Sequence, residues 1–102
     1  MFRLNDYIDK LELDKLCRKH NIKSLSLFGS VVRDELKQNS DIDVLIEFEK
    51  GCTPGLITFI GIQRELSSLI GREVDLRTKG DLSKYFIDKV MNERRIEYPY
   101  CI

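Results

Sequence analysis

The sequence predicts a single α/β domain, because segments with the features of helices and of strands alternate along nearly the whole chain. Four segments are predicted to be helices and three to be strands, in the order helix, strand, helix, strand, helix, strand, helix. No repeat, low-complexity tract or linker interrupts the 102 residues, a length that suits one compact domain. We therefore expect residues 1–102 to form one domain.

The first half of the chain is predicted to hold two helices and two strands. Residues 7–20 have the periodicity of an amphipathic helix, and Asn21 is suited to end it. Residues 24–28 alternate polar and apolar, which predicts a half-buried strand, and a short helix is expected over residues 31–37. Residues 41–48 give the strongest strand pattern; their centre is apolar on both faces, which indicates a strand covered on both sides.

The second half is predicted to hold a long helix, a short strand and a final helix. Thr53–Pro54 supplies an N-cap and a first helical residue, and Gly71 is suited to end the long helix. Residues 73–77 predict the strand and residues 82–95 the last helix, whereas residues 97–102 are expected to be frayed. The buried stripe of the long helix is expected at Leu56, Phe59, Ile60, Leu66, Leu69 and Ile70.

Composition argues against several classes of protein. The 17 Lys and Arg balance 17 Asp and Glu, whereas proteins that grip long nucleic acid carry a strongly basic face. The apolar runs are far shorter than the ~20 residues that cross a bilayer, and the first residues lack the features of a signal peptide. We therefore expect a cytoplasmic protein without membrane or nucleic-acid partners. Cys17, Cys52 and Cys101 are too widely spaced for a zinc site and are expected to be free thiols.

Three carboxylates are the candidate catalytic and metal-binding residues. Asp41 and Asp43 are two positions apart on a predicted strand, so their side chains point the same way from Cα atoms about 6.5 Å apart. Asp75 joins them if the strand at residues 73–77 lies beside theirs. Three acids could hold two Mg²⁺ ions for an in-line nucleotidyl displacement. The alternatives are that the Asp41–Asp43 pair is the polar face of a strand and that Asp75 is a solvated acid on an edge strand.

The Gly29–Ser30 turn is the candidate phosphate site. Glycine lets the backbone approach a ligand, and the first N–H groups of a following helix are free to bind a phosphate together with the Ser30 hydroxyl. Arg33 lies on the same helix face and could reach the same anion. The alternative is that Gly29–Ser30 is simply a helix cap.

With these residues in place, the stretch SLFGSVVRDELKQNSDIDVLIEF, followed by GREVDL, resembles the minimal nucleotidyltransferases (MNT type) of the DNA polymerase beta superfamily. The resemblance implies the nucleotidyltransferase fold, a small mixed sheet flanked by helices (α+β within the broad α/β class). It implies that Gly29, Ser30, Arg33 and Ser40 bind the nucleotide triphosphate, ATP, and that Asp41, Asp43 and Asp75 hold Mg²⁺. Where the family usually has Gly after the Arg, this chain has Asp34, which could repel the nucleotide or point to solvent.

The resemblance also implies a partner. Stand-alone proteins of this kind are often antitoxins paired with HEPN-domain ribonuclease toxins, and in the family the antitoxin transfers AMP from ATP to a tyrosine of its partner. We expect such a protein adenylyltransferase, a type VII-like antitoxin. Two alternatives stay open: a non-catalytic nucleotide-binding antitoxin that acts by contact, and nucleotidyl transfer to a small molecule.

Overall fold

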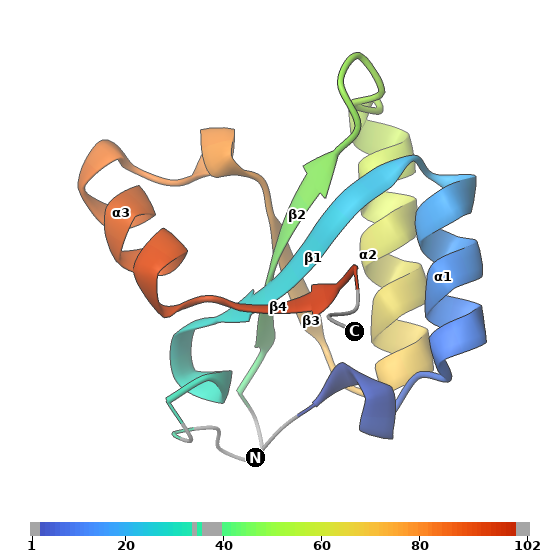
Figure 1. Cartoon of the computed structure of the whole chain (residues 1–102), viewed down its shortest axis with the longest axis horizontal. Helices are drawn as coiled ribbons and strands as arrows, with labels where there is room; N and C mark the ends of the chain where they lie inside the picture. Colours follow the sequence, from blue (N-terminus) through green and yellow to red (C-terminus); the bar gives the residue numbers. More distant parts are fainter. Residues whose placement is uncertain (1–2, 34, 36–39, 100–102) are drawn as a thin grey trace.

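The computed structural model describes residues 3–33, 35 and 40–99 of the chain and shows a four-stranded sheet with helices on both faces (Figure 1). The helices are α1 (Lys10–Lys19), α2 (Leu56–Ile70) and α3 (Lys84–Glu93). The strands are β1 (Ile22–Phe28), β2 (Ile42–Phe48), β3 (Val74–Arg77) and β4 (Arg95–Tyr98). Single 3-10 turns are η1 (Leu4–Asp6), η2 (Gly29–Val31) and η3 (Lys79–Asp81).

The sheet is mixed, as the family resemblance implies. Its strand order is β3-β2-β1-β4. β1 pairs antiparallel with both β2 and β4, whereas β2 pairs with β3 in parallel. The parallel pair is joined through α2, which gives the usual strand, helix, strand crossover.

The main hydrophobic core lies between the sheet and the two helices α1 and α2, which cover the same face (Figure 1). Because side chains alternate along a strand, every second residue of each strand points into this core. From the two central strands and β3 these residues are Leu25, Leu27, Ile42, Val44, Ile46, Val74 and Leu76, all nearly inaccessible to solvent. The helices contribute Leu13, Leu16, Cys17, Ile62, Leu66 and Ile70.

The expected start and buried stripe of the long helix were partly wrong. Gly55, not Thr53, is the N-cap, and α2 begins at Leu56. Leu56 is 73% exposed and Ile60 39% exposed, whereas Ile62, absent from the expected stripe, is fully buried. Leu56 and Ile57 in the first turn of α2 are exposed, whereas Phe59 packs against the core as expected. The predicted end is confirmed: Gly71 adopts a left-handed conformation (φ +78°).

Two further expectations in the first half are corrected. β1 is buried on both faces along most of its length rather than half-buried, because β2 and β4 flank it and helices cover both of its faces. In the expected short helix at residues 31–37, the described residues form no α-helix: η2 ends at Val31 and two turn residues follow. Residues 34, 36 and 37 lie outside the described part of the chain.

The expectation of a frayed tail was wrong for residues 97 and 98. The last helix ends at Glu93, and Arg95–Tyr98 forms β4 against β1. Glu97 is only 4% exposed; its carboxylate accepts a hydrogen bond from the N–H of Leu4 (3.1 Å) and forms an ion pair with Arg3 (3.3 Å). Among the described residues, no helix combines the length and hydropathy that crossing a membrane requires.

Candidate active site

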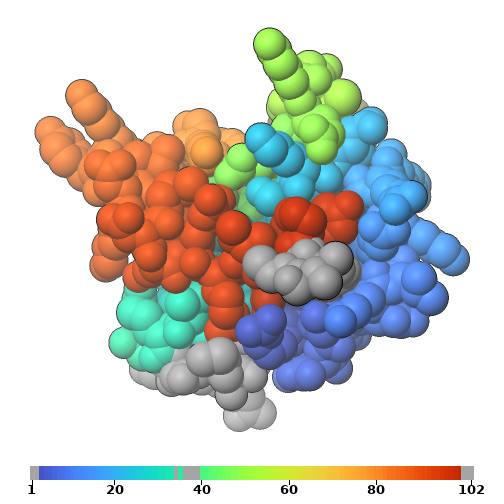
Figure 2. Space-filling view, viewed as in Figure 1, coloured from blue at the N-terminus to red at the C-terminus, as the bar shows by residue number. Residues whose placement is uncertain are grey.

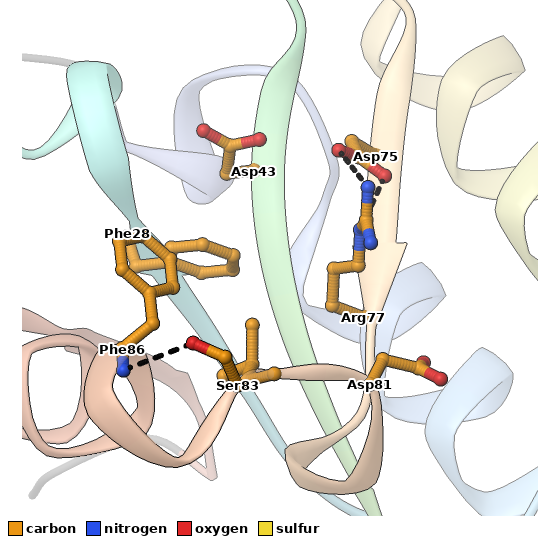
Figure 3. Close-up of a pocket in the computed structure, with 8 residues that line it drawn as sticks. Phe28, Asp43, Asp75, Arg77, Asp81, Ser83 and Phe86 are labelled. Carbon is orange, nitrogen blue, oxygen red and sulfur yellow. Dashed lines mark hydrogen bonds and ion pairs between the residues drawn. The ribbon is translucent and has the colours of Figure 1, made fainter.

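Two of the three predicted acids stand side by side at one end of the sheet. Asp43 of β2 and Asp75 of β3 are direct register partners in the parallel pair, so their Cα atoms lie on neighbouring strands about 4.8 Å apart. Both side chains point away from the main core, because their neighbours Val44 and Val74 point into it. Both carboxylates line one pocket of about 290 Å³ (Figure 3).

Asp75 is held by a cation from its own strand. Arg77, two residues further along β3 and therefore on the same face, donates from Nε to Oδ1 (3.0 Å) and from Nη2 to Oδ2 (3.3 Å) of Asp75. This two-point contact fixes the plane of the Asp75 carboxylate (Figure 3). It also partly balances the negative charge of the pocket.

Asp41 is not part of this pair. It is exposed and directly precedes the first residue of β2. It does not line the pocket, although its charge acts on Asp43. In the described part of the chain, no three His, Cys, Asp or Glu side chains gather closely enough to hold a metal ion, so the expected convergence of three carboxylates is not seen.

The carboxyl group of Asp43 has an unusual environment. Burial, together with the negative charges of Asp75 and Asp41, raises its pKa from 3.8 to about 6, while Arg77 and Arg33 oppose the shift. A carboxylate that resists ionisation gains most from a cation placed beside it. Strongly shifted acids in pockets are typical of functional sites.

Gly29 lies against the side chain of Asp43. It adopts a left-handed φ of +75° at the start of η2, and a Cβ at this position would overlap Oδ2 of Asp43 and lie 3.3 Å from its Cγ. Only glycine combines that conformation with this close approach. The sequence analysis expected Gly29 to let the backbone approach a ligand, whereas the close neighbour that the structure shows is the Asp43 side chain.

The donors expected to bind phosphate already hold an anion from the chain itself. The N–H of Gly29 donates to Oε1 of Glu93, the last residue of α3 (3.1 Å). Arg33 Nη1 donates to both Glu93 oxygens (3.1 and 3.2 Å), and its Nε donates to Glu35 (3.3 Å). Gly29 and Arg33 are thus brought together around one carboxylate.

The two predicted serines are near this region but outside the pocket between Asp43 and Asp75. Ser30 is half-buried in η2, and its carbonyl accepts a hydrogen bond from the N–H of Glu35 (2.9 Å). Ser40 precedes Asp41, and its carbonyl accepts a hydrogen bond from Arg72 (3.0 Å). Asp34, the departure from the family pattern, lies outside the described residues.

The pocket has an aromatic wall opposite the acids. Phe28, at the end of β1, and Phe86, on α3, lie beside each other there (Figure 3). Ser83 caps α3 by accepting a hydrogen bond from the N–H of Phe86 (3.2 Å). Asp81 also lines the pocket, but its Oδ2 accepts hydrogen bonds from the N–H and Oγ1 of Thr78 (both 3.1 Å). The site can therefore receive a flat or apolar group next to paired carboxylates.

Sequence reasoning missed two residues that shape the site, Arg77 and Glu93. Arg77 could have been found, since its spacing of two from Asp75 on a strand puts both on one face. Glu93 could not, because its contacts with Gly29 and Arg33 span more than half of the chain and depend on how α3 folds back.

Comparisons with known proteins agree with this arrangement. A family model described as nucleotidyltransferase domain matches residues 10–96. A protein of Methanocaldococcus jannaschii named "Putative protein adenylyltransferase" is 36% identical over 84 residues, which are 82% of this chain and 88% of the relative. The protein adenylyltransferase MntA of Thermococcus cleftensis is 35% identical over 79 residues, 78% of each chain.

Solved structures share the fold. One described as a putative minimal nucleotidyltransferase is 28% identical with a TM-score of 0.69, covering 92% of this chain and 95% of that one. A crystal structure of a toxin-antitoxin with AMP-PNP is 22% identical with a TM-score of 0.71, covering 91% and 75%. A complex of a tri-AMPylated Shewanella oneidensis HEPN toxin with an MNT antitoxin is 21% identical with a TM-score of 0.62, covering 88% and 69%.

Proposed function

Since this chain belongs to the nucleotidyltransferase domain family, we propose that it transfers AMP from ATP to a hydroxyl group of a protein partner. The observation that carries the proposal is the register pairing of Asp43 with Asp75, which line one pocket, with Gly29 against Asp43. Two carboxylates beside a backbone turn that can approach a phosphate are what phosphoryl-type transfer requires.

The paired acids fit a divalent cation. Asp43 and Asp75 offer oxygen ligands, which Mg²⁺ prefers, and burial together with the charges of Asp75 and Asp41 keeps the pKa of Asp43 raised even though Arg77 and Arg33 oppose the shift. Bound there, Mg²⁺ would polarise the α-phosphate and ease deprotonation of the attacking hydroxyl. Asp43 would hold it from β2 and Asp75 from β3, with Arg77 keeping the Asp75 carboxylate in plane. Asp41, exposed beside Asp43, is the candidate for a further ligand and a second ion.

The triphosphate is proposed to lie along η2. The Gly29 N–H and the Arg33 guanidinium face the same point, where they bind a carboxylate in the structure, and both are donors that suit a phosphate oxygen equally well. Ser30 within η2 and Ser40 before Asp41 are the further proposed nucleotide-binding residues. That a structure of the same fold was obtained with AMP-PNP supports a nucleotide as the substrate.

For the acceptor, we propose a tyrosine of a HEPN-domain toxin. Two relatives carry names of protein adenylyltransferases, and a solved structure of the same fold pairs an MNT antitoxin with an AMPylated HEPN toxin. The balanced charge of the chain also suits a protein partner better than a nucleic acid. The side of the pocket formed by Phe28 and Phe86 is open to an aromatic acceptor.

The test is to incubate the chain with Mg-ATP and the protein encoded by the neighbouring gene and to weigh the intact partner. We expect a gain of one or more AMP groups, lost with Asp43→Asn and kept with the exposed Asp88→Asn on α3. No gain in mass under conditions where the chain binds ATP would overturn adenylyl transfer.

One observation favours a second candidate, an antitoxin that acts by contact alone. Gly29 and Arg33 are both engaged by Glu93, an arrangement in which the phosphate donors are satisfied without nucleotide. Such a protein would still neutralise its partner after Asp43→Asn, whereas the enzyme would not. Toxin activity measured with this variant separates the two candidates.

A further inference from the structure

Glu93 is the last residue of α3, and its carboxylate binds the two groups that we propose as phosphate donors, the Gly29 N–H and the Arg33 guanidinium. Its Oε1 accepts from the Gly29 N–H, and both of its oxygens accept from Arg33 Nη1, all within 3.1–3.2 Å. Its side chain is 20% exposed and that of Arg33 is 41% exposed, so solvent reaches the contact from one side. In the space-filling view the end of α3 lies directly against the turn that follows β1 (Figure 2).

Glu93 does not stabilise α3, the helix to which it belongs. The C-terminal end of a helix has a partial negative charge, so an acidic side chain is unfavourable there, and the last turn of α3 holds no basic residue to offset it. α3 is held to the sheet instead by Val90, with Leu82 and Met91, packed on Phe28 and Leu45. The position of the Glu93 carboxylate is therefore set by Gly29 and Arg33.

A carboxylate and a phosphate compete for such donors. Both accept hydrogen bonds from backbone N–H groups and from guanidinium nitrogens at similar distances. Two anions cannot share the Gly29 N–H, and Asp43 already lies on the other side of Gly29. A triphosphate can occupy this position only if the Glu93 carboxylate leaves it.

We propose that Glu93 is an internal competitor for the polyphosphate subsite formed by the Gly29 N–H and Arg33, and that nucleotide binding displaces it. The inference rests on the proposed nucleotide site. Displacement needs only rotation of the Glu93 side chain into the solvent at its open side, because the apolar contacts of Val90 keep α3 in place. The wild-type chain therefore binds polyphosphate more weakly than its donors allow, in proportion to the fraction of molecules in which Glu93 has left.

The test compares Glu93→Gln with Glu35→Gln, using ATP and inorganic tripolyphosphate as the probes in titration calorimetry. Both variants remove one carboxylate bound to Arg33, but only Glu93 also engages Gly29, and Glu35 is 63% exposed. We expect Glu93→Gln to bind both probes about five- to tenfold more tightly and Glu35→Gln to change affinity less than about twofold. Equal or weaker binding by Glu93→Gln, or an equal gain in both variants, would overturn the proposal.

A measurement on the wild-type chain covers the case in which Glu93→Gln does not fold. The ¹³C resonance of the Glu93 carboxyl carbon must move as tripolyphosphate saturates the protein, and an unmoved resonance overturns the displacement. Failure of the two proposals can be distinguished. If neither the wild type nor any variant binds ATP or tripolyphosphate, the proposed nucleotide site is wrong. If the wild type binds ATP and transfers AMP but Glu93→Gln binds the probes no more tightly, only the role of Glu93 as a competitor is wrong.

Discussion

The two faces of the sheet differ sharply in how they are covered. One face packs against both α1 and α2 and forms a continuous core in which nearly every strand side chain is inaccessible to solvent. On the other face α3 forms a small apolar cluster of Phe28, Leu45 and Val90. The same strands supply both faces, since Val44 points into the large core while Asp43 and Leu45 point the other way.

The difference shows how a chain of 102 residues can hold both a core and a site. The α1–α2 face supplies most of the apolar burial that offsets the entropy of folding. The α3 face carries the charged groups of the proposed site, and Asp43, Asp75 and Glu93 all lie there. Stability and the proposed chemistry should therefore respond to different substitutions.

The largest effect on stability should come from the α1–α2 face. Leu66 is 1% exposed on α2, so Leu66→Ala removes a packed side chain and should lower the free energy of unfolding by about 3 kcal/mol. Leu56 on the same helix is 73% exposed, and Leu56→Ala should change it by less than about 0.5 kcal/mol. Urea unfolding measures both, and similar losses for the two leucines would contradict the assigned core.

The contact between Gly29 and Asp43 should give the next largest effect. Gly29 and Gly51 have nearly the same left-handed φ, +75° and +78°, but a Cβ would meet Asp43 only at Gly29, with nothing within 4 Å at Gly51. Gly51→Ala should destabilise by about 1 kcal/mol for backbone conformation alone, and Gly29→Ala by about 2 kcal/mol or more. Thermal unfolding of the pair checks this, and AMP transfer should fall only in Gly29→Ala. Equal destabilisation would mean that Asp43 does not crowd Gly29.

A difference of only about 1 kcal/mol is expected between a matched pair of valines, one on each face. Val44 lies in the large core and Val90 in the small cluster, and both are at most 1% exposed. Val44→Ala should lower the free energy of unfolding by about 2 kcal/mol, whereas Val90→Ala should lower it by about 1 kcal/mol because α3 can shift to close the gap. If Val90→Ala lowered the free energy of unfolding more than Val44→Ala, the α3 face would not be packed more loosely than the α1–α2 face.

Much of the acidic site followed from local sequence patterns. The strands predicted at residues 41–48 and 73–77 are present as β2 and β3, but the meeting of Asp75 with Asp43 was expected only if the two strands were neighbours, and their parallel pairing came from the structure. Asp41 directly precedes the strand and does not line the pocket, so its part in the site stays a prediction. The first residue of a strand depends on where the neighbouring strand begins to pair with it, and the sequence of one segment alone does not determine this.

Other features depended on contacts that no local pattern contains. β4 is a short, charged edge strand, and its burial comes from pairing with β1 and from Glu97 binding Leu4 at the other end of the chain. The engagement of Arg33 by Glu93 likewise exists only once α3 returns to the turn after β1. Sequence periodicity relates only residues that are close along the chain, so it cannot predict such long-range pairs.

The pKa of Asp43 links the stability of the fold to the proposed chemistry. Because burial and neighbouring acids raise this pKa from 3.8 to about 6, the Asp43 contribution to stability is fully present below pH 3.8 and is lost as the pH rises through about 6. At pH 7.5 without Mg²⁺ the ionised carboxylate therefore opposes folding, by about 1 kcal/mol once the partial exposure of the group is taken into account.

The central claim is that Asp43, on the α3 face, lowers the stability of the fold and is required for AMP transfer. The most direct test is to measure both the unfolding and the AMP transfer of Asp43→Asn at pH 7.5. The variant should be about 1 kcal/mol more stable than the wild type without Mg²⁺, with the gain vanishing towards pH 4, and should lose AMP transfer by about a thousandfold or more. A variant that is less stable at pH 7.5, or that still transfers AMP at a similar rate, would contradict the account.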